Sequence, residues 1–362
     1  VRPSYVLGGR GMAIVYDDSD LITYMESATH VTPDRPVYLD AFLEDAIELD
    51  VDALCDTEEC YVGSVLEHIE ECGIHSGDSA CCWPPFSLSE KIVDQIRAIT
   101  KKLALACGIR GLLNIQYAVR DEHVFVIELN PRASRTVPFS SKATGVSLAK
   151  YASRIMAGEK ISELRAQGLL PDENRTVDYY AVKEAVMPWS RFPGADSILG
   201  PEMKSTGEVM GIARTFPAAY AKTREAVENK LPKQGSVFIS VCDRDKRAIA
   251  PVAMALENLG YGIYTTGGTA KTLRAAGIDC TTVNRISDGH PNVVDLMRDK
   301  TVSFIINTPH GHEAHSDGAR MRAEAVSQGI TCVTAMSAAT ALIQALAAAR
   351  KSEPETFALQ DL

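Results

Sequence analysis

The chain has 362 residues, 46% of them hydrophobic and 23% charged, and 37 Lys+Arg against 47 Asp+Glu give a formal net charge of −10. This composition excludes a disordered or collagen-like chain, and the length predicts about two domains. The acidic balance argues against a nucleic-acid or membrane-surface binder, because such proteins concentrate positive charge. We therefore expect an anionic ligand to be held by local groups.

Targeting and cysteine patterns predict a soluble, cytoplasmic protein. No stretch approaches the roughly 20 apolar residues that cross a bilayer, and the start at Val1-Arg2-Pro3-Ser4 lacks the apolar core of a signal peptide. The nine cysteines contain no Cys-x-x-Cys spacing, which favours reduced thiols over a structural zinc site. Because the chain has no initiator Met, we expect a fragment of a longer polypeptide.

The first part of the chain mixes strands and helices as antiparallel α+β domains do. Ile47–Ala53 alternates strictly, which predicts a strand with one polar and one apolar face. A helix over Glu90–Cys107 precedes a predicted hairpin of Leu112–Val119 and Val124–Asn130. A charged helical segment at Ala218–Lys230 is expected to link this domain to the next.

The pattern from Ser236 onward is more regular, with apolar runs alternating with helical segments. Five strands, each followed by a helix, predict a doubly wound parallel α/β domain, whose ligands bind outside the carboxyl ends of the strands. We place the two domains at 1–225 and 226–362. The expected strands are Ser236–Val241, Tyr261–Thr265, Asp279–Arg285, Ser303–Asn307 and Thr331–Thr334, and the expected helices are Ala248–Asn258, Thr269–Ala276, Pro291–Asp299, Ala319–Ser327 and Ala338–Arg350.

Three oxygen-bearing side chains of the predicted hairpin are expected to converge. Glu128 and Asn130 are two residues apart on one strand and so share a face. Gln116 lies opposite Glu128 if the hairpin loop has an odd number of residues. Carboxylate and carbonyl oxygens, together with substrate phosphates, suit a hard cation such as Mg²⁺. On alternation alone, a solvated polar sheet face is the alternative.

Two neighbouring features point to phosphate. Arg132 and Arg135 follow the second hairpin strand, where guanidinium groups could clamp a transferring phosphoryl group. Three glycines in Leu7-Gly8-Gly9-Arg10-Gly11 would allow the backbone to approach phosphates closely. That segment follows neither a Walker pattern nor the dinucleotide fingerprint, so each feature is weak by itself.

Four long motifs carry a more specific signal. They are Arg2-Pro3-Ser4-Tyr5-Val6-Leu7-Gly8-Gly9-Arg10, Glu67-His68-Ile69-Glu70, Gly73-Ile74-His75-Ser76-Gly77-Asp78-Ser79 and Glu128-Leu129-Asn130-Pro131-Arg132-Ala133-Ser134-Arg135-Thr136-Val137-Pro138-Phe139. Together they closely resemble the second, carboxy-terminal half of the carbamoyl-phosphate synthase large chain. The resemblance spans the chain and weakens after about Pro309. It implies a partial ATP-grasp domain, missing its amino-terminal part, and a methylglyoxal-synthase-like allosteric domain.

The resemblance also implies a function. The family makes carbamoyl phosphate from bicarbonate, an amide-derived ammonia and two ATP molecules, and this half resembles the one that phosphorylates carbamate. ATP and Mg²⁺ or Mn²⁺ are then the expected cofactors, with K⁺ as a further ion, in pyrimidine and arginine synthesis. A small, glutaminase chain is the expected partner in an oligomeric complete enzyme, and the fragment alone should be inactive. The alternatives are an effector-binding module without catalysis and another ATP-grasp ligase.

Roles for the ATP site carry over from the resemblance. Gln116, Glu128 and Asn130 would hold the metal ions, with Glu128 bridging, and Arg132 and Arg135 would face the carbamate and the phosphoryl group. The expected nucleotide contacts are Arg2 at phosphate, the segment from Ala41 to Leu43 at adenine, Glu48 at the ribose, and Gly73, Ile74, His75 and Ser76 in a closing loop, with Gln116 and Glu128 beneath. His75 is thus expected in the nucleotide pocket and not as a general base.

Effector residues are implied in the same way. UMP is the expected inhibitor, with IMP and ornithine as further candidates. The nucleotide residues fall at or after predicted strand ends, as a ligand crevice in this fold requires. They are Lys246, Thr266, Thr269, Arg285, Asn307 and Thr308, and the ornithine residues are Glu70, Asp78 and Glu184.

The far end departs from the family pattern. Position 285 is more often Lys in bacterial relatives, so Arg285 keeps the charge with a different contact geometry. Thr331–Ala339 has lost the aromatic and paired-threonine features that couple ornithine to both domains in relatives, which argues against ornithine activation. The histidines that follow Pro309 favour hydrogen bonding over zinc; they are His310, His312 and His315.

Overall fold

A computed structural model describes residues 1–4, 11–31, 37–173, 175–192, 194–227, 231–308, 317–351, 356 and 358–361. The chain forms two compact units. The parallel unit comprises Val1–Asp40, Val186–Gly207 and Arg224–Glu353, and the antiparallel unit comprises Ala41–Ala185, Glu208–Thr223 and Pro354–Leu362. Each unit therefore contains segments from both sides of the predicted boundary at residues 225 and 226. The predicted domains 1–225 and 226–362 stay a prediction.

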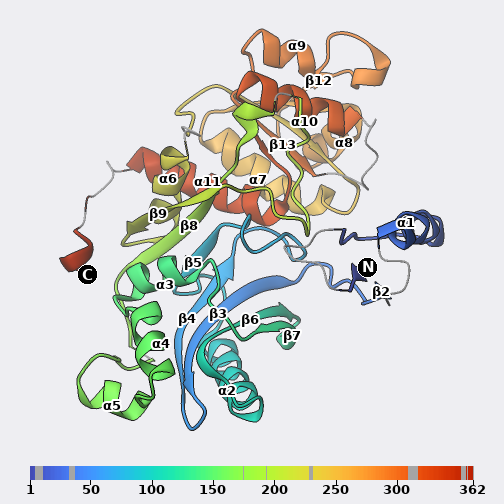
Figure 1. The fold of residues 1–362 in the computed structure, drawn as a ribbon. Helices are drawn as coiled ribbons and strands as arrows, with labels where there is room; N and C mark the ends of the chain where they lie inside the picture. Colours follow the sequence, from blue (N-terminus) through green and yellow to red (C-terminus); the bar gives the residue numbers. More distant parts are fainter. Residues whose placement is uncertain are drawn as a thin grey trace. The chain divides into compact units, whose positions relative to one another are not determined.

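A seven-stranded sheet in the order β7-β6-β3-β4-β5-β8-β9 forms the centre of the antiparallel unit (Figure 1). Its neighbours from β7 to β8 pair antiparallel, which confirms the predicted sheet type. The strands are β3 (Ile47–Asp56), β4 (Cys60–His68), β5 (Cys81–Trp83), β6 (Arg110–Arg120), β7 (His123–Asn130), β8 (Tyr180–Val186) and β9 (Gly207–Ala213).

The two faces of this sheet differ in chemistry because β3 alternates. Leu49 and Val51 point to a core that is closed by α2 (Glu90–Ala106), whose Ile96 is fully buried. This confirms the predicted helix. On the opposite face, helices pack against the end of β3 around Leu54. The polar side chains of this face lie nearer the start of β3. The further helices of this unit are α3 (Val137–Thr144), α4 (Leu148–Met156), α5 (Ile161–Ala166) and α6 (Phe216–Ala226).

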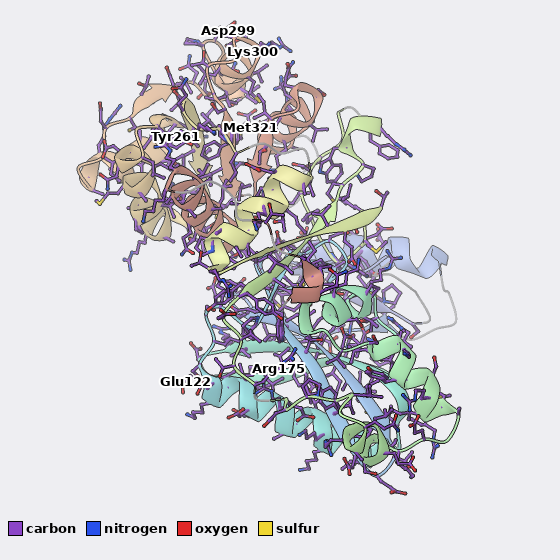
Figure 2. The ribbon with its side chains drawn as sticks, turned by 90° about the vertical axis from the view of Figure 1, so that its left-hand side faces the viewer. Glu122, Arg175, Tyr261, Asp299, Lys300 and Met321 are labelled. Atoms are coloured by element: carbon purple, nitrogen blue, oxygen red, sulfur yellow. The ribbon has the colours of Figure 1, made fainter. Side chains whose placement is uncertain are left out.

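The β6–β7 hairpin reaches the predicted pairing by a different route. Its loop has two residues, Asp121 and Glu122, of which Glu122 is labelled in Figure 2. Their φ values of 50° and 62° fit a type I′ turn. A two-residue loop alone would pair Gln116 with Ile127. A β-bulge between Gln116 and Tyr117 shifts the register, so that Gln116 pairs with Glu128. The pairing of Gln116 with Glu128 is therefore confirmed, although the loop does not have the odd number of residues on which it was made conditional.

The parallel unit contains a five-stranded sheet in the order β12-β11-β10-β13-β14, with every neighbouring pair parallel. All five predicted strands are present. Ser236–Val241 has the predicted bounds, and the other four strands differ from the prediction by one or two residues at one or both ends, because short strands fray first at their ends. They are β10 (Ser236–Val241), β11 (Gly262–Thr266), β12 (Thr281–Val283), β13 (Phe304–Thr308) and β14 (Thr331–Val333).

Helices cover this sheet on both faces, as a doubly wound fold requires. Helix α7 contacts α8 and α11, and α9 contacts α10, so the helices form two groups (Figure 1). Phe238 and Ile305 pack with Met321 of α10 (labelled in Figure 2). The helices are α7 (Lys246–Asn258), α8 (Gly267–Ala275), α9 (Val293–Arg298), α10 (Asp317–Gln328) and α11 (Met336–Lys351).

Short elements complete the described chain. The parallel unit also holds helix α1 and a two-stranded sheet of β1 and β2. Their bounds are α1 (Asp18–Val31), β1 (Arg2–Pro3) and β2 (Val37–Tyr38), and the 3₁₀ turns are η1 (Trp189–Arg191), η2 (Ile286–Asp288) and η3 (Leu359–Asp361). Within the described residues, no helix combines the length and apolar character that a membrane span needs.

Candidate active site

The three predicted metal ligands share one face of the β6–β7 hairpin. Gln116 lies opposite Glu128, and Asn130 follows two residues later. Asn130 Nδ2 donates to Glu128 Oε1 at 2.6 Å, and Gln116 Nε2 donates to Ser76 Oγ at 2.9 Å. Both bonds use amide nitrogens, so that, among the residues the structure describes, the two amide oxygens stay available to a cation.

This donor set fits a hard cation that is bound together with phosphates. Among the described residues, no group of three or more His, Cys, Asp or Glu side chains is arranged to hold a metal ion. Of the three candidate ligands, Glu128 alone is a carboxylate. Mg²⁺ is usually held by one or two carboxylates plus substrate phosphates, with water completing its shell. The residues therefore fit a metal ion that a nucleotide helps to bind.

The predicted closing loop is tied to the same face. The Gly73 amide donates to Glu48 Oε2 at 3.1 Å, and Lys183 Nζ donates to the Ser76 carbonyl at 3.1 Å. With the bond from Gln116, three side chains from three strands hold the two ends of the loop. Glu48 is buried, and burial raises the pKa of its carboxyl group. The structure thus brings the loop, Glu48 and the hairpin together.

His75 presents a neutral ring to this region. Burial lowers its pKa and outweighs the opposing charge of Asp78, while the charge of Arg135 adds to the lowering. Its Nδ1 accepts a hydrogen bond from the Gly77 amide at 3.0 Å. The proton of the neutral ring therefore sits on Nε2, which can donate but not accept. This chemistry agrees with a pocket residue and argues against a general base.

Sequence reasoning missed a buried polar network beside these residues. His68 Nε2 bonds Asp50 Oδ2 at 3.0 Å, and Asn114 Nδ2 donates to Asp50 Oδ1 at 3.1 Å. Burial alone would raise the pKa of Asp50 and lower that of His68, but their contact outweighs burial and shifts both the other way. The signal was present, because Asp50 and Asp52 continue the alternation that contains Glu48. The polar face of β3 is therefore buried here, since Asp50 is 1% exposed.

Arg132 and Arg135 lie on the loop that joins β7 to α3. The Arg132 amide donates to the Asn130 carbonyl at 2.8 Å, and its guanidinium donates to the Ala133 carbonyl at 3.1 Å. Both arginines are exposed. They follow Glu128 and Asn130 directly, so their side chains start from the end of the strand that carries the candidate metal ligands.

The three predicted ornithine residues are not surface carboxylates. Asp78 and Glu184 are 2% and 6% exposed. Burial raises the pKa of Glu70 to about 7, and the charge of Glu184 adds to this effect. The Ala80 amide donates to Glu70 Oε2 at 2.6 Å, and Thr223 Oγ1 donates to Glu184 Oε2 at 2.9 Å. A nearby cation would stabilise the charged form of these groups.

The other predicted nucleotide contacts are placed less completely. Ala41 and Leu43 lie in the segment just before β3, in the antiparallel unit. Arg2 belongs to the parallel unit, where its Nε bonds Asp40 Oδ2 at 2.6 Å. Residues 5–10, which contain most of the glycine-rich segment, lie outside the described residues. The role of Arg2 therefore stays a prediction.

The predicted effector residues gather at the carboxyl ends of neighbouring parallel strands. Thr266 Oγ1 lies 3.4 Å from Ser240 Oγ, and Asn307 Nδ2 donates to the Ser240 carbonyl at 2.9 Å. Thr269 Oγ1 accepts from the Val241 amide at 3.4 Å. This arrangement joins the ends of β10, β11 and β13 through side-chain contacts.

The remaining effector residues lie at the same edge. Thr308 Oγ1 accepts from the Cys242 amide at 3.1 Å. Lys246 opens α7, and its Nζ lies 3.4 Å from the position that a Cβ at Gly268 would occupy. Arg285 follows β12 and is exposed. His310, His312 and His315 lie outside the described residues.

Comparison with known proteins covers both units. Residues 1–164 match the family model "Carbamoyl-phosphate synthase L chain, ATP binding domain", and residues 248–334 match "MGS-like domain". The carbamoyl phosphate synthase large chain of Renibacterium salmoninarum is 49% identical to this chain over 383 residues, which cover 100% of this chain and 35% of that relative. The large chain of Corynebacterium glutamicum is 50% identical over 378 residues, which cover 100% of this chain and 34% of that relative. Over its whole length the chain is therefore similar to carbamoyl-phosphate synthase large chains.

The chain covers only part of the length of these relatives. The Pasteurella multocida large chain is 48% identical over 363 residues, which is 100% of this chain and 33% of that relative. The chain thus spans about a third of the length of these curated relatives. The predicted ATP-grasp part and the methylglyoxal-synthase-like part are both confirmed.

Solved structures add little to this assignment. The biotin carboxylase domain of Hydrogenobacter thermophilus 2-oxoglutarate carboxylase is 19% identical, with a TM-score of 0.48 over 63% of this chain and 55% of that one. A similarity this low bears on neither the site residues nor the reaction.

Proposed function

We propose that this chain binds ATP with Mg²⁺ and phosphorylates carbamate to carbamoyl phosphate, as the carboxy-terminal part of a carbamoyl-phosphate synthase large chain. The observation that carries this proposal is the shared face of Gln116, Glu128 and Asn130, within a region that matches an ATP-binding family model. Mn²⁺ would substitute for Mg²⁺, and K⁺ is a further candidate ion. A small, glutamine-hydrolysing chain would complete the cytoplasmic, oligomeric enzyme of pyrimidine and arginine synthesis.

Positioning and electrostatics would do the chemical work. Gln116, Glu128 and Asn130 would hold the metal, which when bound neutralises phosphate oxygens. Arg132 and Arg135 would donate hydrogen bonds to the carbamate and to the equatorial oxygens of the γ-phosphoryl group as charge gathers there. The carbamate oxygen would attack the γ-phosphorus while the bond from that phosphorus to the β,γ-bridging oxygen breaks and ADP leaves, so no nucleophilic side chain is required.

The nucleotide would be bound by groups around the same face. Glu48 would accept from the ribose hydroxyls, Ala41 to Leu43 would pass the adenine, and Arg2 would contact phosphate. The loop from Gly73 to Ser76 would exclude water from the transferring group, supported by its bonds to Glu48, Gln116 and Lys183.

We further propose that the parallel unit binds UMP, with IMP as an alternative, at the carboxyl ends of its strands. Its support is the cluster that joins β10, β11 and β13 and the start of α8 at Gly267, where backbone amides suit a phosphate. Arg285, Asn307 and Thr308 would complete the contacts. The buried acids Asp78 and Glu184, with the half-buried Glu70, suit an amine such as ornithine. The residues of Thr331–Ala339 argue against its coupling to activity.

Direct titration tests both proposals. We expect calorimetry on this chain to show separate binding of MgATP and of UMP. Binding of UMP without MgATP would support an effector-binding module that has no ATP site of its own. Binding of neither ligand would contradict both assignments.

Replacing Lys246 by Ala is expected to weaken UMP binding by about 1–3 kcal/mol, the scale of a lost hydrogen bond to a charged group. Calorimetry of the variant and of a Lys351→Ala control measures this, because Lys351 is an exposed residue in the last turn of α11. Equal UMP affinity in the Lys246 variant and the control would remove Lys246 from the effector site.

A further inference from the structure

Asp52 of β3 carries a buried carboxylate that four donors share. Its Oδ1 accepts from Asn114 Nδ2 at 3.0 Å and from Ser134 Oγ at 2.6 Å. Its Oδ2 accepts from Thr136 Oγ1 at 2.6 Å and from Ser140 Oγ at 2.9 Å. The residue is 0% exposed. Burying a carboxylate is costly unless its oxygens are satisfied, and here each oxygen accepts two bonds.

The loop between β7 and α3 points its side chains in two directions. Ser134 and Thr136 reach inward to Asp52, whereas Arg132 and Arg135 are exposed. A loop lacks the repeated backbone hydrogen bonds that hold a strand or a helix. The Asp52 carboxylate therefore holds the loop by one hydrogen bond on either side of Arg135, from Ser134 and from Thr136.

Asp52 itself stands on a rigid part of the sheet. It pairs with Ser64 on one neighbouring strand and with Asn114 on the other. Ser64 Oγ also donates to Ser140 Oγ at 2.8 Å. The next position on β4, Gly63, forms a β-bulge, where a Cβ would lie 2.7 Å from Leu148 Cδ2. Central strands with locked neighbours hold side chains more firmly than loops do.

We propose that Asp52 is a positioning residue for phosphoryl transfer, which fixes the turn carrying Arg132 and Arg135 through the hydroxyls of Ser134 and Thr136. The inference rests on the proposed function, because it needs these arginines to face the transferring group. Asp52 lies behind the loop and touches no substrate. A misplacement of about 1 Å in a catalytic group can cost about a hundredfold in rate.

The test uses the complete large chain that contains this sequence, assembled with its small chain. Formation of ATP from carbamoyl phosphate and MgADP reverses the proposed step and reports on it alone. We expect Ser134→Ala with Thr136→Val to lower kcat at least about tenfold and to leave the KM for MgADP unchanged, because the loop and not the nucleotide contacts is released. Restoring the hydroxyl with Thr136→Ser should recover most of the rate.

Ser140→Ala is the matched control. It removes the hydroxyl of α3 that donates to the Asp52 carboxylate, and it leaves the bonds from Ser134 and Thr136 of the loop in place. It should change kcat by less than about threefold. Asp52→Asn should resemble the double variant, since an amide offers a single acceptor oxygen. An unchanged kcat in the double variant, a change confined to KM, or an equal loss in Ser140→Ala would each overturn the proposal.

Hydrogen exchange separates this inference from the proposed function. The amides of residues 132–137 should exchange faster in the double variant than in the unaltered protein, and those of β3 should not. If the unaltered protein forms no ATP but the loop amides still respond, the reaction assignment fails and the anchor stands. If the loop amides do not respond, the anchor fails whatever the activity.

Discussion

Glu128→Gln is expected to lower the rate of carbamate phosphorylation at least about a hundredfold while UMP affinity stays unchanged. Glu128 is the single carboxylate of the trio, and the substitution keeps its shape but removes the charge that attracts a divalent cation. The Asn130 amide that bonds Glu128 can still find an oxygen acceptor in Gln. ATP formation from carbamoyl phosphate and MgADP measures the first effect, and calorimetry with UMP measures the second.

Glu122→Gln provides the matched control. Glu122 lies in the turn of the same hairpin (Figure 2), and its ion pair with Lys91 is long, at 3.5 Å, and exposed. The control removes an equal charge from the same element without touching the candidate site, so its rate should stay near that of the unaltered protein. Equal rates in the two variants would end the metal assignment.

His68→Ala is expected to destabilise the antiparallel unit by about 3–5 kcal/mol, because it leaves the buried Asp50 charge without its partner. The side chains of His68 and Asp50 are 0% and 2% exposed. Urea unfolding measures the loss through Trp83, which lies in this unit, in a Trp189→Phe background. Adding Asp50→Asn should return part of the stability, because the uncompensated charge is then removed. A loss below about 1 kcal/mol would show that the pair is not a buried ion pair.

The same pair predicts a pH dependence. The pKa of Asp50 is lowered below its ordinary 3.8, so its contribution is present above pH 3.8 and is lost as the pH falls through the lower folded value. The pKa of His68 is raised above 6.5, so its contribution is present below pH 6.5 and is lost as the pH rises through the higher folded value. The difference in the free energy of unfolding between the unaltered chain and His68→Ala should therefore be largest between pH 3.8 and pH 6.5, where both contributions are present.

The regular half of the fold was the most predictable from sequence. In the parallel unit, strands such as Ser236–Val241 are short apolar runs and α7 follows at once, so local periodicity determines both. The carboxyl ends of those strands meet because parallel connection leaves no other arrangement, which placed Thr266 and Asn307 at one edge.

The hairpin shows the limit of counting. Spacing alone put Glu128 and Asn130 on one face, because strand side chains alternate with period two. Whether Gln116 joins them depends on the register, and the register depends on a bulge that adds one residue between Val126 and Glu128. No local residue pattern specifies that bulge, so its effect appears only in the folded sheet.

By itself, the sequence determined which elements form and which face of each strand is polar, since both follow from neighbours a few residues apart. Only the tertiary structure decided that the polar face of β3 is buried and what satisfies it. Asp52 meets Thr136, and Asp50 meets His68, across long stretches of chain. Such partners are selected by packing in three dimensions, because a buried charge must find its donors wherever the fold brings them.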